Sequence, residues 1–475
     1  MAKRFFVLFL LISLYFSIPV SSALAYYTNM SADVVIGQPD FISNSSTTTQ
    51  NSLSNPLGVF SDGTHLFVSD GNNNRVLIWN SIPTKNGTAA DIVLGQPDFI
   101  SSTANNGGIS ARTLNSAPYC VYSDGTHLVV CDQNNRRVLI WNSIPTTNQQ
   151  AADVVVGQPD FVTSSAGTTA SKFTFAIGAL IYNGKLIVAD TGNNRVLIFN
   201  SIPKTNGASA DVVIGNTNFT SITSGTTAST FGVSNGTGPR GIVMIDGKLI
   251  VDDPGNRRVL IFNSLPTTNG VSADVVVGEP DFTTRTAEAD LGISCARLNG
   301  NETVASAANG RLVIGDNHRV LIFNQIPTSN GASADIVLGQ SDCVTKTANN
   351  GGLSASSLNG NIRPGVEVNN KLFVADSSNS RLLIFNNVIS TPVIGLYPFP
   401  EAVGNGRLRM RGNVRLGEWE RYILSNSKME VSVNGGGYGA VSSLYGNRED
   451  THDNLYEFFH EFDPSPIPGG TEGYT

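Results

Sequence analysis

The fold of this chain is decided by the stretch Asp70-Gly71-Asn72-Asn73-Asn74-Arg75-Val76-Leu77-Ile78-Trp79-Asn80, because five close variants of it follow. The variants are Asp132 to Asn142, Asp190 to Asn200, Asp253 to Asn263, Asp316 to Asn324 and Asp376 to Asn386. From each leading Asp to the next, the steps are 62, 58, 63, 63 and 60 residues. A nearly fixed period of this size indicates a repeat architecture, in which one structural unit is copied along the chain.

Each repeat predicts four short strands. The run Val76 to Trp79 is continuously apolar, is bounded by Asn and Asp and is too short for a helix, which indicates a strand covered on both faces. Two further runs precede it, Leu57 to Phe60 and His65 to Asp70, and a fourth, Ala90 to Gly95, follows a loop and is stopped by a proline. Four antiparallel strands of this length form one blade of a β-propeller.

The order of the strands predicts how the ring closes. The fourth strand occurs six times, and its first copy, Asp33 to Gly37, comes before any of the other three. The last repeat has no clear fourth strand of its own. We therefore expect an all-β, six-bladed propeller in which Asp33 to Gly37 completes the sixth blade and leaves no open sheet edge. Thr391 to Leu396 is the alternative for that place.

Two copies of the repeat show a family resemblance. The segments Asp190-Thr191-Gly192-Asn193-Asn194-Arg195-Val196 and Asp316-Asn317-His318-Arg319-Val320 resemble the NHL repeat, whose members form six-bladed, TolB-like propellers. The resemblance covers roughly Ser31 to Asn387. It implies the fold but selects no function, because propellers of this family serve as protein-binding, RNA-binding and enzymatic scaffolds.

The two ends of the chain differ from the repeats. Residues 1–25 combine Lys3 and Arg4, an apolar run and small residues before Ala25, which predicts a signal peptide cut after Ala25. A retained membrane anchor is the alternative. The propeller is expected over 26–396, and 397–475 is expected to be an accessory region, β-rich or partly disordered, or an incomplete domain. Within that region, Arg407 to Arg411 and Glu430 to Val433 predict strands, and Asp453 to Phe462 predicts a helix.

Composition and charge limit the classes of partner and the cellular location that we expect. The 475 residues carry 30 Lys and Arg against 37 Asp and Glu, a net charge of -7, and no basic run is interleaved with aromatic residues. Nucleic acid is therefore not expected as a partner. With the signal peptide removed, no stretch is apolar enough to span a bilayer. We expect a monomer that is secreted, extracellular or on the cell surface, with the periplasm as the alternative.

The 4 cysteines are an even number in an exported chain, which favours disulfides over metal ligands. Cys120 and Cys131 face each other if Asp124 and His127 close the hairpin between them. Cys295 and Cys343 lie in the loops that enter and leave the fifth blade and form a second candidate bridge. Buried free thiols are the alternative.

Repetition assigns the recurring charges to structure. The pairs formed by Asp70 with Arg75, Asp190 with Arg195, Asp316 with Arg319, and Asp376 with Arg381 have counterparts at Asp132 with Arg136 or Arg137, and at Asp253 with Arg257 or Arg258. An active site needs one asymmetric constellation, whereas these pairs recur in every blade. We expect each Asp to hold the Asn-rich turn and each Arg to pair at a blade junction.

The long polar loops and the Asp-to-Arg turns should emerge on one face, which, with the channel mouth, is the default binding site. Candidate ligand-binding residues at the mouth start the first strands: Asn55, Tyr119, Arg240, Asn301, Glu302 and Arg363. Lactonases and related hydrolases of similar fold bind calcium there, which the resemblance would transfer to Asn55, Asn301 and Glu302. The similar peptide-amidating lyase holds zinc through three histidines, for which this chain has no matching positions.

These observations lead to two hypotheses. The first is an exported, non-enzymatic propeller, without a cofactor or catalytic residues, that presents its loop-rich face to a protein, peptide or glycan. The alternative is a secreted lyase or hydrolase that uses calcium or zinc at the channel mouth. No isolated catalytic constellation stands out among the repeats, which favours the first.

Overall fold

The computed structural model describes residues 26–115, 118–285, 292–299 and 310–386 in full, and Thr303–Ser306 and seven strands between residues 393 and 462 by their backbone. The chain divides into two compact units. One is Tyr26–Asn387, and the other contains Val388–Thr475. The signal peptide predicted over residues 1–25 lies outside the described residues.

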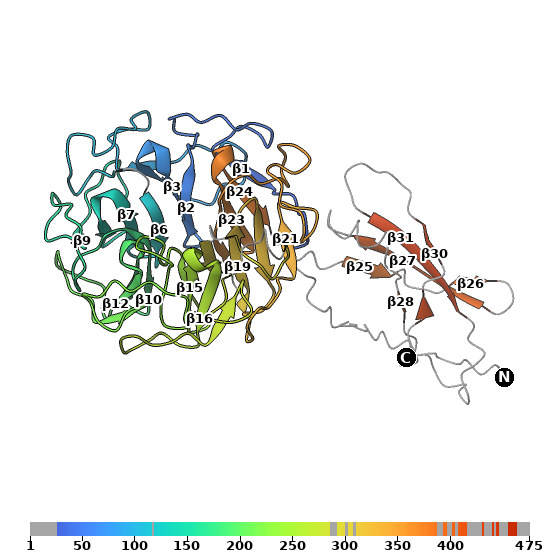
Figure 1. Cartoon of the computed structure of the whole chain (residues 1–475). Coiled ribbons are helices and arrows are strands. Elements are labelled where there is room, and N and C mark those ends of the chain that lie inside the picture. Colours follow the sequence, from blue (N-terminus) through green and yellow to red (C-terminus); the bar gives the residue numbers. More distant parts are fainter. Residues whose placement is uncertain are drawn as a thin grey trace, which may run out of the picture. The chain divides into compact units, whose positions relative to one another are not determined.

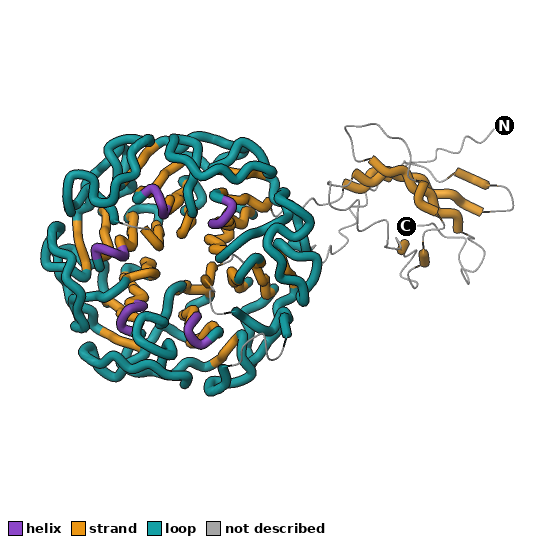
Figure 2. The backbone as a smooth tube through the Cα atoms, turned by 45° about the horizontal axis from the view of Figure 1, so that its top comes forward, coloured by secondary structure: helices purple, strands orange, loops and turns teal. Residues whose placement is uncertain are grey.

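The first unit is a six-bladed β-propeller, as the sequence predicts (Figures 1 and 2). Each blade is an antiparallel sheet of four strands. The strands of blades 1 to 3 are β2 (Pro56–Ser61), β3 (Leu66–Asp70), β4 (Arg75–Trp79) and β5 (Ile92–Leu94); β6 (Pro118–Ser123), β7 (Leu128–Asp132), β8 (Arg137–Trp141) and β9 (Val154–Val156); and β10 (Ala176–Tyr182), β11 (Lys185–Asp190), β12 (Arg195–Phe199) and β13 (Val212–Ile214). The strands of blades 4 to 6 are β14 (Ile242–Ile245), β15 (Lys248–Asp253), β16 (Arg258–Phe262) and β17 (Val275–Val277); β18 (Thr303–Ser306), β19 (Leu312–Asp316), β20 (Arg319–Phe323) and β21 (Ile336–Leu338); and β22 (Ile362–Val368), β23 (Lys371–Asp376), β24 (Arg381–Asn386) and β1 (Val34–Ile36).

A short 3-10 helix joins the second and third strands in five of the blades. These helices are η1 (Gly71–Asn73), η2 (Gln133–Asn135), η3 (Thr191–Asn193), η4 (Pro254–Asn256) and η6 (Ser377–Asn379). Figure 2 shows the strands arranged around a central opening, with these helical turns grouped around it. Each turn ends in a residue with left-handed backbone, such as Asn74 with a φ of 51°. This position holds Asn in two of the five turns and Arg or Ser in the others, whereas the Asn that recurs in these turns precedes it and, as Asn73 does in blade 1, donates a hydrogen bond to the repeated Asp.

The hydrophobic core lies in the wedges between neighbouring blades. Strand β4 shows why its sequence is continuously apolar: Val76 and Ile78 pack with residues of blade 2, whereas Leu77 and Trp79 pack with residues of blade 6. All five residues of this strand are buried. The third strand of every blade is therefore covered on both faces, as its residue pattern predicts.

The N-terminal strand closes the ring. Strand β1 pairs antiparallel with β24 of the last blade, so that Val35 lies opposite Leu383. This confirms the predicted closure by Asp33 to Gly37. The alternative is wrong, because Val393–Leu396 forms strand β25, which pairs with β27 of the second unit.

The loop before the fourth strand of a blade forms hydrogen bonds with the outer strand of the preceding blade, and between blades 5 and 6 residues near the N-terminus form these bonds. In blade 2, the loop before the fourth strand holds the outer strand of blade 1: the Val93 N–H donates to Oδ1 of Asn148 at 3.1 Å, and the Gln149 N–H donates to the Val93 carbonyl at 2.8 Å. In the last wedge, the Val337 N–H donates to Oγ1 of Thr28 at 3.4 Å, and the Asn29 N–H donates back to the Val337 carbonyl at 2.9 Å. Residues 28–29 therefore replace a loop of blade 6.

The second unit is β-rich, as expected. Its strands are β25 (Val393–Leu396), β26 (Glu401–Val403), β27 (Arg407–Arg415), β28 (Glu430–Val431), β29 (Gly439–Ala440), β30 (Ser443–Tyr445) and β31 (Leu455–Phe462). The helix predicted over Asp453 to Phe462 is wrong, since Leu455–Phe462 pairs with β27 over its whole length. Phe and Tyr favour strands, and ten residues are too few for the spacing of apolar residues to separate the two structures.

Both candidate disulfides are present. Cys120 is bonded to Cys131 across strands β6 and β7, and Cys295 is bonded to Cys343, which joins the loops that enter and leave blade 5. The pair Ser123 and Leu128 lies in the register that the first prediction assumed. Two bridges favour an oxidising compartment, outside the cell or in the periplasm. Among the described residues, no helix has the length and apolarity needed to cross a bilayer.

Candidate functional site

Each repeated Asp and Arg forms a buried ion pair. The distances are 2.7 Å for Asp70 with Arg75, Asp132 with Arg137 and Asp376 with Arg381, and 2.9 Å for Asp190 with Arg195, Asp253 with Arg258 and Asp316 with Arg319. All twelve side chains are fully buried. In the two blades where the sequence left a choice, Arg137 and Arg258 are therefore the partners, and Arg136 and Arg257 take the left-handed turn position.

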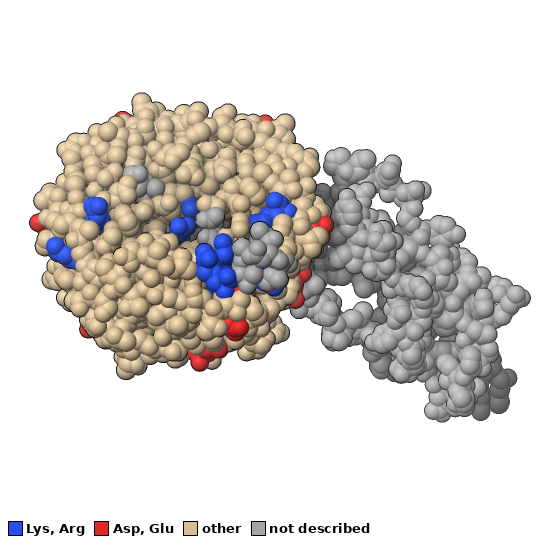
Figure 3. Space-filling model, viewed as in Figure 1, with Lys and Arg blue, Asp and Glu red and all other residues tan. Residues whose placement is uncertain are grey.

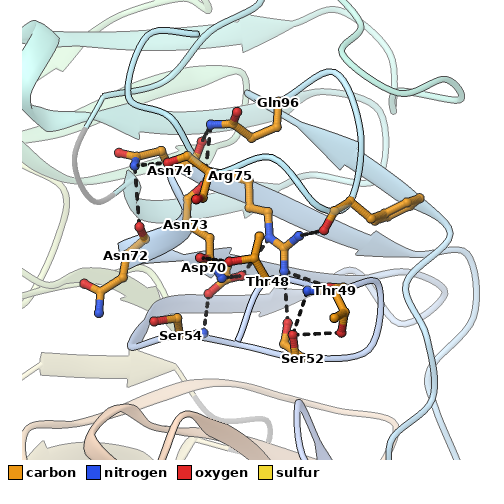
Figure 4. A network of polar contacts seen from close by, with 12 residues as sticks. Thr48, Thr49, Ser52, Ser54, Asp70, Asn72, Asn73, Asn74, Arg75 and Gln96 are labelled. Atoms are coloured by element: carbon orange, nitrogen blue, oxygen red, sulfur yellow. Dashed lines mark hydrogen bonds and ion pairs between the residues drawn. The ribbon is translucent and has the colours of Figure 1, made fainter. Parts of the chain in front are cut away.

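Figure 4 shows the pair of blade 1 in its network. Asp70 accepts hydrogen bonds from the Ser54 N–H at 2.6 Å, from Nδ2 of Asn73 at 2.8 Å and from Nε of Arg75 at 2.7 Å. Arg75 also donates to the carbonyls of Thr49 at 2.9 Å and Phe99 at 2.5 Å, which belong to the loops before and after this blade. Burial raises the pKa of Asp70, and Arg75 opposes that shift. These groups fasten the long loops and are closed to a ligand.

The propeller contains a cavity of about 220 Å³ along its channel, lined by the inner strands of blades 1, 2, 3, 4 and 6. Three of the predicted mouth residues line it: Tyr119, Arg240 and Arg363. They come from blades 2, 4 and 6 and start their inner strands, next to the Asp-to-Arg turns. At the corresponding positions of blades 1 and 3 lie the apolar Leu57 and Ile177. The mouth is thus asymmetric, unlike the ion pairs around it.

The three polar side chains are close together. The guanidinium carbon of Arg363 lies 5.1 Å from the centre of the Tyr119 ring, a cation–π distance. Arg363 is 8% exposed, and its Nη1 has no hydrogen-bond partner among the described residues; the same holds for Nε of the half-buried Arg240. Burial lowers the pKa of Arg363, Tyr119 opposes that shift, and the positive charge of Arg240 adds to it.

Of the other predicted mouth residues, Asn55 is described by the structure, and it does not join this group. Asn55 is half-buried in the left-handed conformation and donates a 3.4 Å hydrogen bond to Oδ1 of Asn72. It lies at the start of the turn and is not among the residues that line the cavity. Asn301 and Glu302 lie outside the described residues, so the calcium site proposed from Asn55, Asn301 and Glu302 stays a prediction.

Sequence reasoning missed one residue of this region, Asp252. Its side chain is fully buried, and neither carboxylate oxygen has a hydrogen-bond partner among the described residues. The corresponding position holds a small residue in every other blade: Ser69, Cys131, Ala189, Gly315 and Ala375. The signal was the doublet Asp252-Asp253, in which an extra acid precedes the repeated one.

Asp252 is electrostatically coupled to the mouth. Burial raises its pKa well above the usual value for Asp, the charges of Arg240 and Arg363 oppose that shift, and the neighbouring Asp253 adds to it. Asp252 does not line the cavity. It therefore acts on the two guanidinium groups through its charge and not by touching a ligand.

The opposite end of the cavity is apolar and aromatic. Phe60 and Tyr122 line it where their strands approach the hairpin turns, and their ring centres are 4.4 Å apart. Burial, with the charge of Asp124, raises the pKa of Tyr122 to about 12, so its phenol is neutral at physiological pH. The cavity therefore runs from a cationic mouth to an uncharged aromatic floor.

On the face drawn in Figure 3, Lys and Arg side chains are spread from the margin to the middle, and most of the acidic side chains in view lie near the margin. Among the described residues, no three His, Cys, Asp or Glu side chains lie close enough to share a metal ion.

The histidines whose side chains are described do not converge. Nδ1 of His65 lies 2.8 Å from Asp62, and Nδ1 of His127 lies 2.9 Å from Asp124, each within its own hairpin. Nδ1 of His318 accepts a 2.8 Å hydrogen bond from the Gly360 N–H. His65 and His127 each contact an Asp of their own hairpin, whereas His318 joins the turn of blade 5 to the loop that enters blade 6.

Several solved structures are similar to this chain at low sequence identity. A structural genomics protein of unknown function from Bacteroides thetaiotaomicron is 10% identical, with 75% of each chain covered and a TM-score of 0.42. A proposed 6-phosphogluconolactonase from Bacteroides fragilis is 14% identical, with 71% of this chain and 82% of that chain covered and a TM-score of 0.39. Glutaminyl cyclase from Myxococcus xanthus is 12% identical, with 74% and 95% covered and a TM-score of 0.31. No family model and no curated protein matches the chain.

Proposed function

We propose that this chain is an exported, non-enzymatic propeller of the NHL type that binds a protein, peptide or glycan at its loop-rich face and channel mouth. The observation that carries the proposal is the makeup of the mouth. The side chains that break the sixfold repeat there are Tyr119, Arg240 and Arg363, which offer hydrogen-bond donors, positive charge and an aromatic face. Such groups are typical anchors of binding sites.

The chemistry of these side chains favours binding over catalysis. Hydrolysis by nucleophilic catalysis needs a nucleophile within hydrogen-bond reach of a base. Along the described part of the cavity wall, the polar side chains are two guanidinium groups, which have N–H donors but no acceptor, and tyrosine phenols. The rigid ring, with its loops fastened by six buried ion pairs, holds the mouth in one geometry.

The proposal includes the location and state of the protein. The predicted signal peptide, cut after Ala25, and the two disulfides support export to an oxidising compartment. We propose a monomer, since the N-terminal strand completes the sixth blade within one chain and not by pairing with a second copy.

Elemental analysis after secretion and exhaustive dialysis tests the proposal against the metal-dependent alternative. We expect less than about a tenth of an equivalent of calcium or zinc. A stoichiometric metal that is lost on Glu302→Gln would instead support a lyase or hydrolase that uses Asn55, Asn301 and Glu302. The matched control is Glu401→Gln, a change outside the propeller.

A further inference from the structure

We propose that the channel mouth binds a carboxylic acid with an apolar stem: the carboxylate meets Arg240 and Arg363, and the stem fills the channel toward Phe60 and Tyr122. This inference rests on the proposed binding function and names the chemistry of the ligand. It follows from the donors at the mouth, the excess of charge there, and the apolar character of the cavity behind it.

The donors at the mouth call for an acceptor. Nη1 of Arg363 and Nε of Arg240 are buried N–H donors without a partner among the described residues, and Arg363 is more than nine-tenths buried. Buried donors that are left unpaired are costly, and guanidinium groups match the geometry of a carboxylate. The six structural arginines differ, because each has its Nε on an Asp oxygen.

The charges at the mouth select an anion. Among the described residues of the mouth, Arg240 and Arg363 stand against one acid, Asp252, so this part of the mouth has an excess of one positive charge if Asp252 is ionised and of two if it is protonated. Asp252 is fully buried and does not line the cavity, so a ligand meets the arginines and not the acid. A cationic ligand would meet two like charges directly, whereas a carboxylate offsets positive charge in either protonation state of Asp252.

The cavity behind the mouth suits an apolar stem. Beyond the arginines its wall contains Val59, Ala179, Ile242 and Val366, and Phe60 and Tyr122 lie at its end. Its volume of about 220 Å³ exceeds the roughly 150 Å³ of an apolar cavity that admits benzene. A ring on a short chain with a terminal carboxylate fits both the volume and the polarity.

Isothermal titration calorimetry with four related probes tests this inference on the full-length protein. The probes are 3-phenylpropionate, its neutral amide, 3-phenylpropylamine and acetate. We expect one molecule of 3-phenylpropionate to bind, and the amide, the amine and acetate to bind at least ten-fold more weakly. Equal binding of the amide, tighter binding of the amine, or no binding of 3-phenylpropionate would overturn the inference.

Two substitutions locate the site. Arg240→Gln, at a half-buried position that the fold tolerates, should weaken binding of 3-phenylpropionate at least ten-fold, and Met244→Trp should block the stem and abolish it. The control Arg112→Gln changes an exposed arginine away from the channel and should bind like the parent. Parental affinity in Arg240→Gln would contradict the assignment.

The same titration separates failure of this inference from failure of the proposed function. If the amide binds as tightly as the acid and Met244→Trp still blocks both, the channel is a binding site but not one for an acid. If nuclear magnetic resonance of the recovered probe shows chemical conversion, the protein is a catalyst and the proposed function itself is wrong.

Discussion

Two kinds of buried acid lie side by side in blade 4. Asp253 accepts hydrogen bonds from Gly232, Asn256 and Arg258, whereas neither carboxylate oxygen of Asp252, its neighbour in the chain, has a hydrogen-bond partner among the described residues. A paired acid stabilises the loops that it holds, but an acid without partners costs desolvation energy that the fold must offset elsewhere. Residues kept at such a cost are often functional, which is why Asp252 draws attention to the mouth.

Loss of a paired acid should be severe. Asp190→Ala removes the acceptor for the Thr174 N–H, Asn193 and Arg195 and leaves the guanidinium buried without its counter-charge. We expect a loss of about 3–5 kcal/mol in the free energy of unfolding, measured by urea denaturation. The exposed Lys204→Ala in the same blade should change little. Equal effects of the two substitutions would refute the structural role of the pair.

Loss of the Asp252 carboxylate should instead increase the free energy of unfolding. Burial raises the pKa of Asp252 in the folded protein above its value of about 3.9 in the unfolded chain. The folded state therefore binds this proton more tightly, and the stability it provides is present below pH 4 and lost as the pH rises through the folded pKa. We expect Asp252→Asn to unfold like the parent near pH 4 and to be about 1–3 kcal/mol more stable at pH 8.

A control in the same blade makes this measurement specific. Asp246→Asn changes an exposed residue of the hairpin turn and should keep the pH dependence of the parent. If Asp252→Asn is less stable than the parent at pH 8, the negative charge of Asp252 stabilises the fold through Arg240 and Arg363. The net desolvation cost that we assign to Asp252 would then be wrong.

Repetition explains what could be predicted about these residues. The six Asp and Arg pairs were predicted as structural because the pair recurs in every blade. The two residues flank the same turn each time, so the sequence also predicts that they lie close together. Asp252 was missed because it occurs once, next to a repeated Asp, and only the small residues at the same position of the other blades mark it as unusual. Burial without partners is a tertiary property that one residue in a sequence does not reveal.

At the scale of elements, the strands of the propeller were predictable and one element of the second unit was not. Val76 to Trp79 is apolar at every position because it faces two wedges, a pattern that excludes an amphipathic helix. Leu455–Phe462 was misjudged because its pairing with β27, distant in the sequence, decides its structure. The hydrogen bonds of Thr28 and Asn29 with Val337 were also missed. Residues 28–29 are recognised as equivalent to the loop at Asn148 and Gln149 only after β1 has been aligned with the fourth strands of the other blades.

The two disulfides connect elements over different lengths of chain. Their sequence separations are 48 residues for Cys295–Cys343 and 11 residues for Cys120–Cys131. Closing a longer loop restricts the unfolded chain more, so removing the first bridge by a double alanine substitution should cost about 4 kcal/mol and removing the second about 3 kcal/mol. Urea denaturation without reductant measures both. A larger loss for the Cys120–Cys131 variant would contradict this order.

On the scale of the whole molecule, the first and last strands of the unit Tyr26–Asn387 meet to complete the propeller. Strand β1 completes the sheet of blade 6, and residues 28–29 contact the outer strand of blade 5. The ring is therefore complete only when the N-terminal segment has docked. A closed ring has no exposed central edge, which protects a sheet protein from edge-to-edge aggregation.

Removing this segment should open the ring. Deletion of residues 26–37 removes Val34, Val35 and Ile36, all buried, and with them roughly 5 kcal/mol of burial free energy. We expect a lower melting temperature and aggregation, followed by light scattering during heating. Deletion of Val393–Leu396, which pairs within the other unit, is the matched control and should leave the melting of the propeller unchanged. If deletion of Val393–Leu396 destabilised the propeller and deletion of residues 26–37 did not, the ring would be closed by Val393–Leu396.

The central claim is that the channel mouth, where Tyr119, Arg240 and Arg363 depart from the sixfold repeat, is where this protein binds its ligand. A crystal structure of the protein with 3-phenylpropionate tests it most directly. The account predicts the carboxylate against Arg240 and Arg363, with the phenyl ring in the channel toward Phe60 and Tyr122. An empty channel, or the ligand held only among the outer loops, would contradict it.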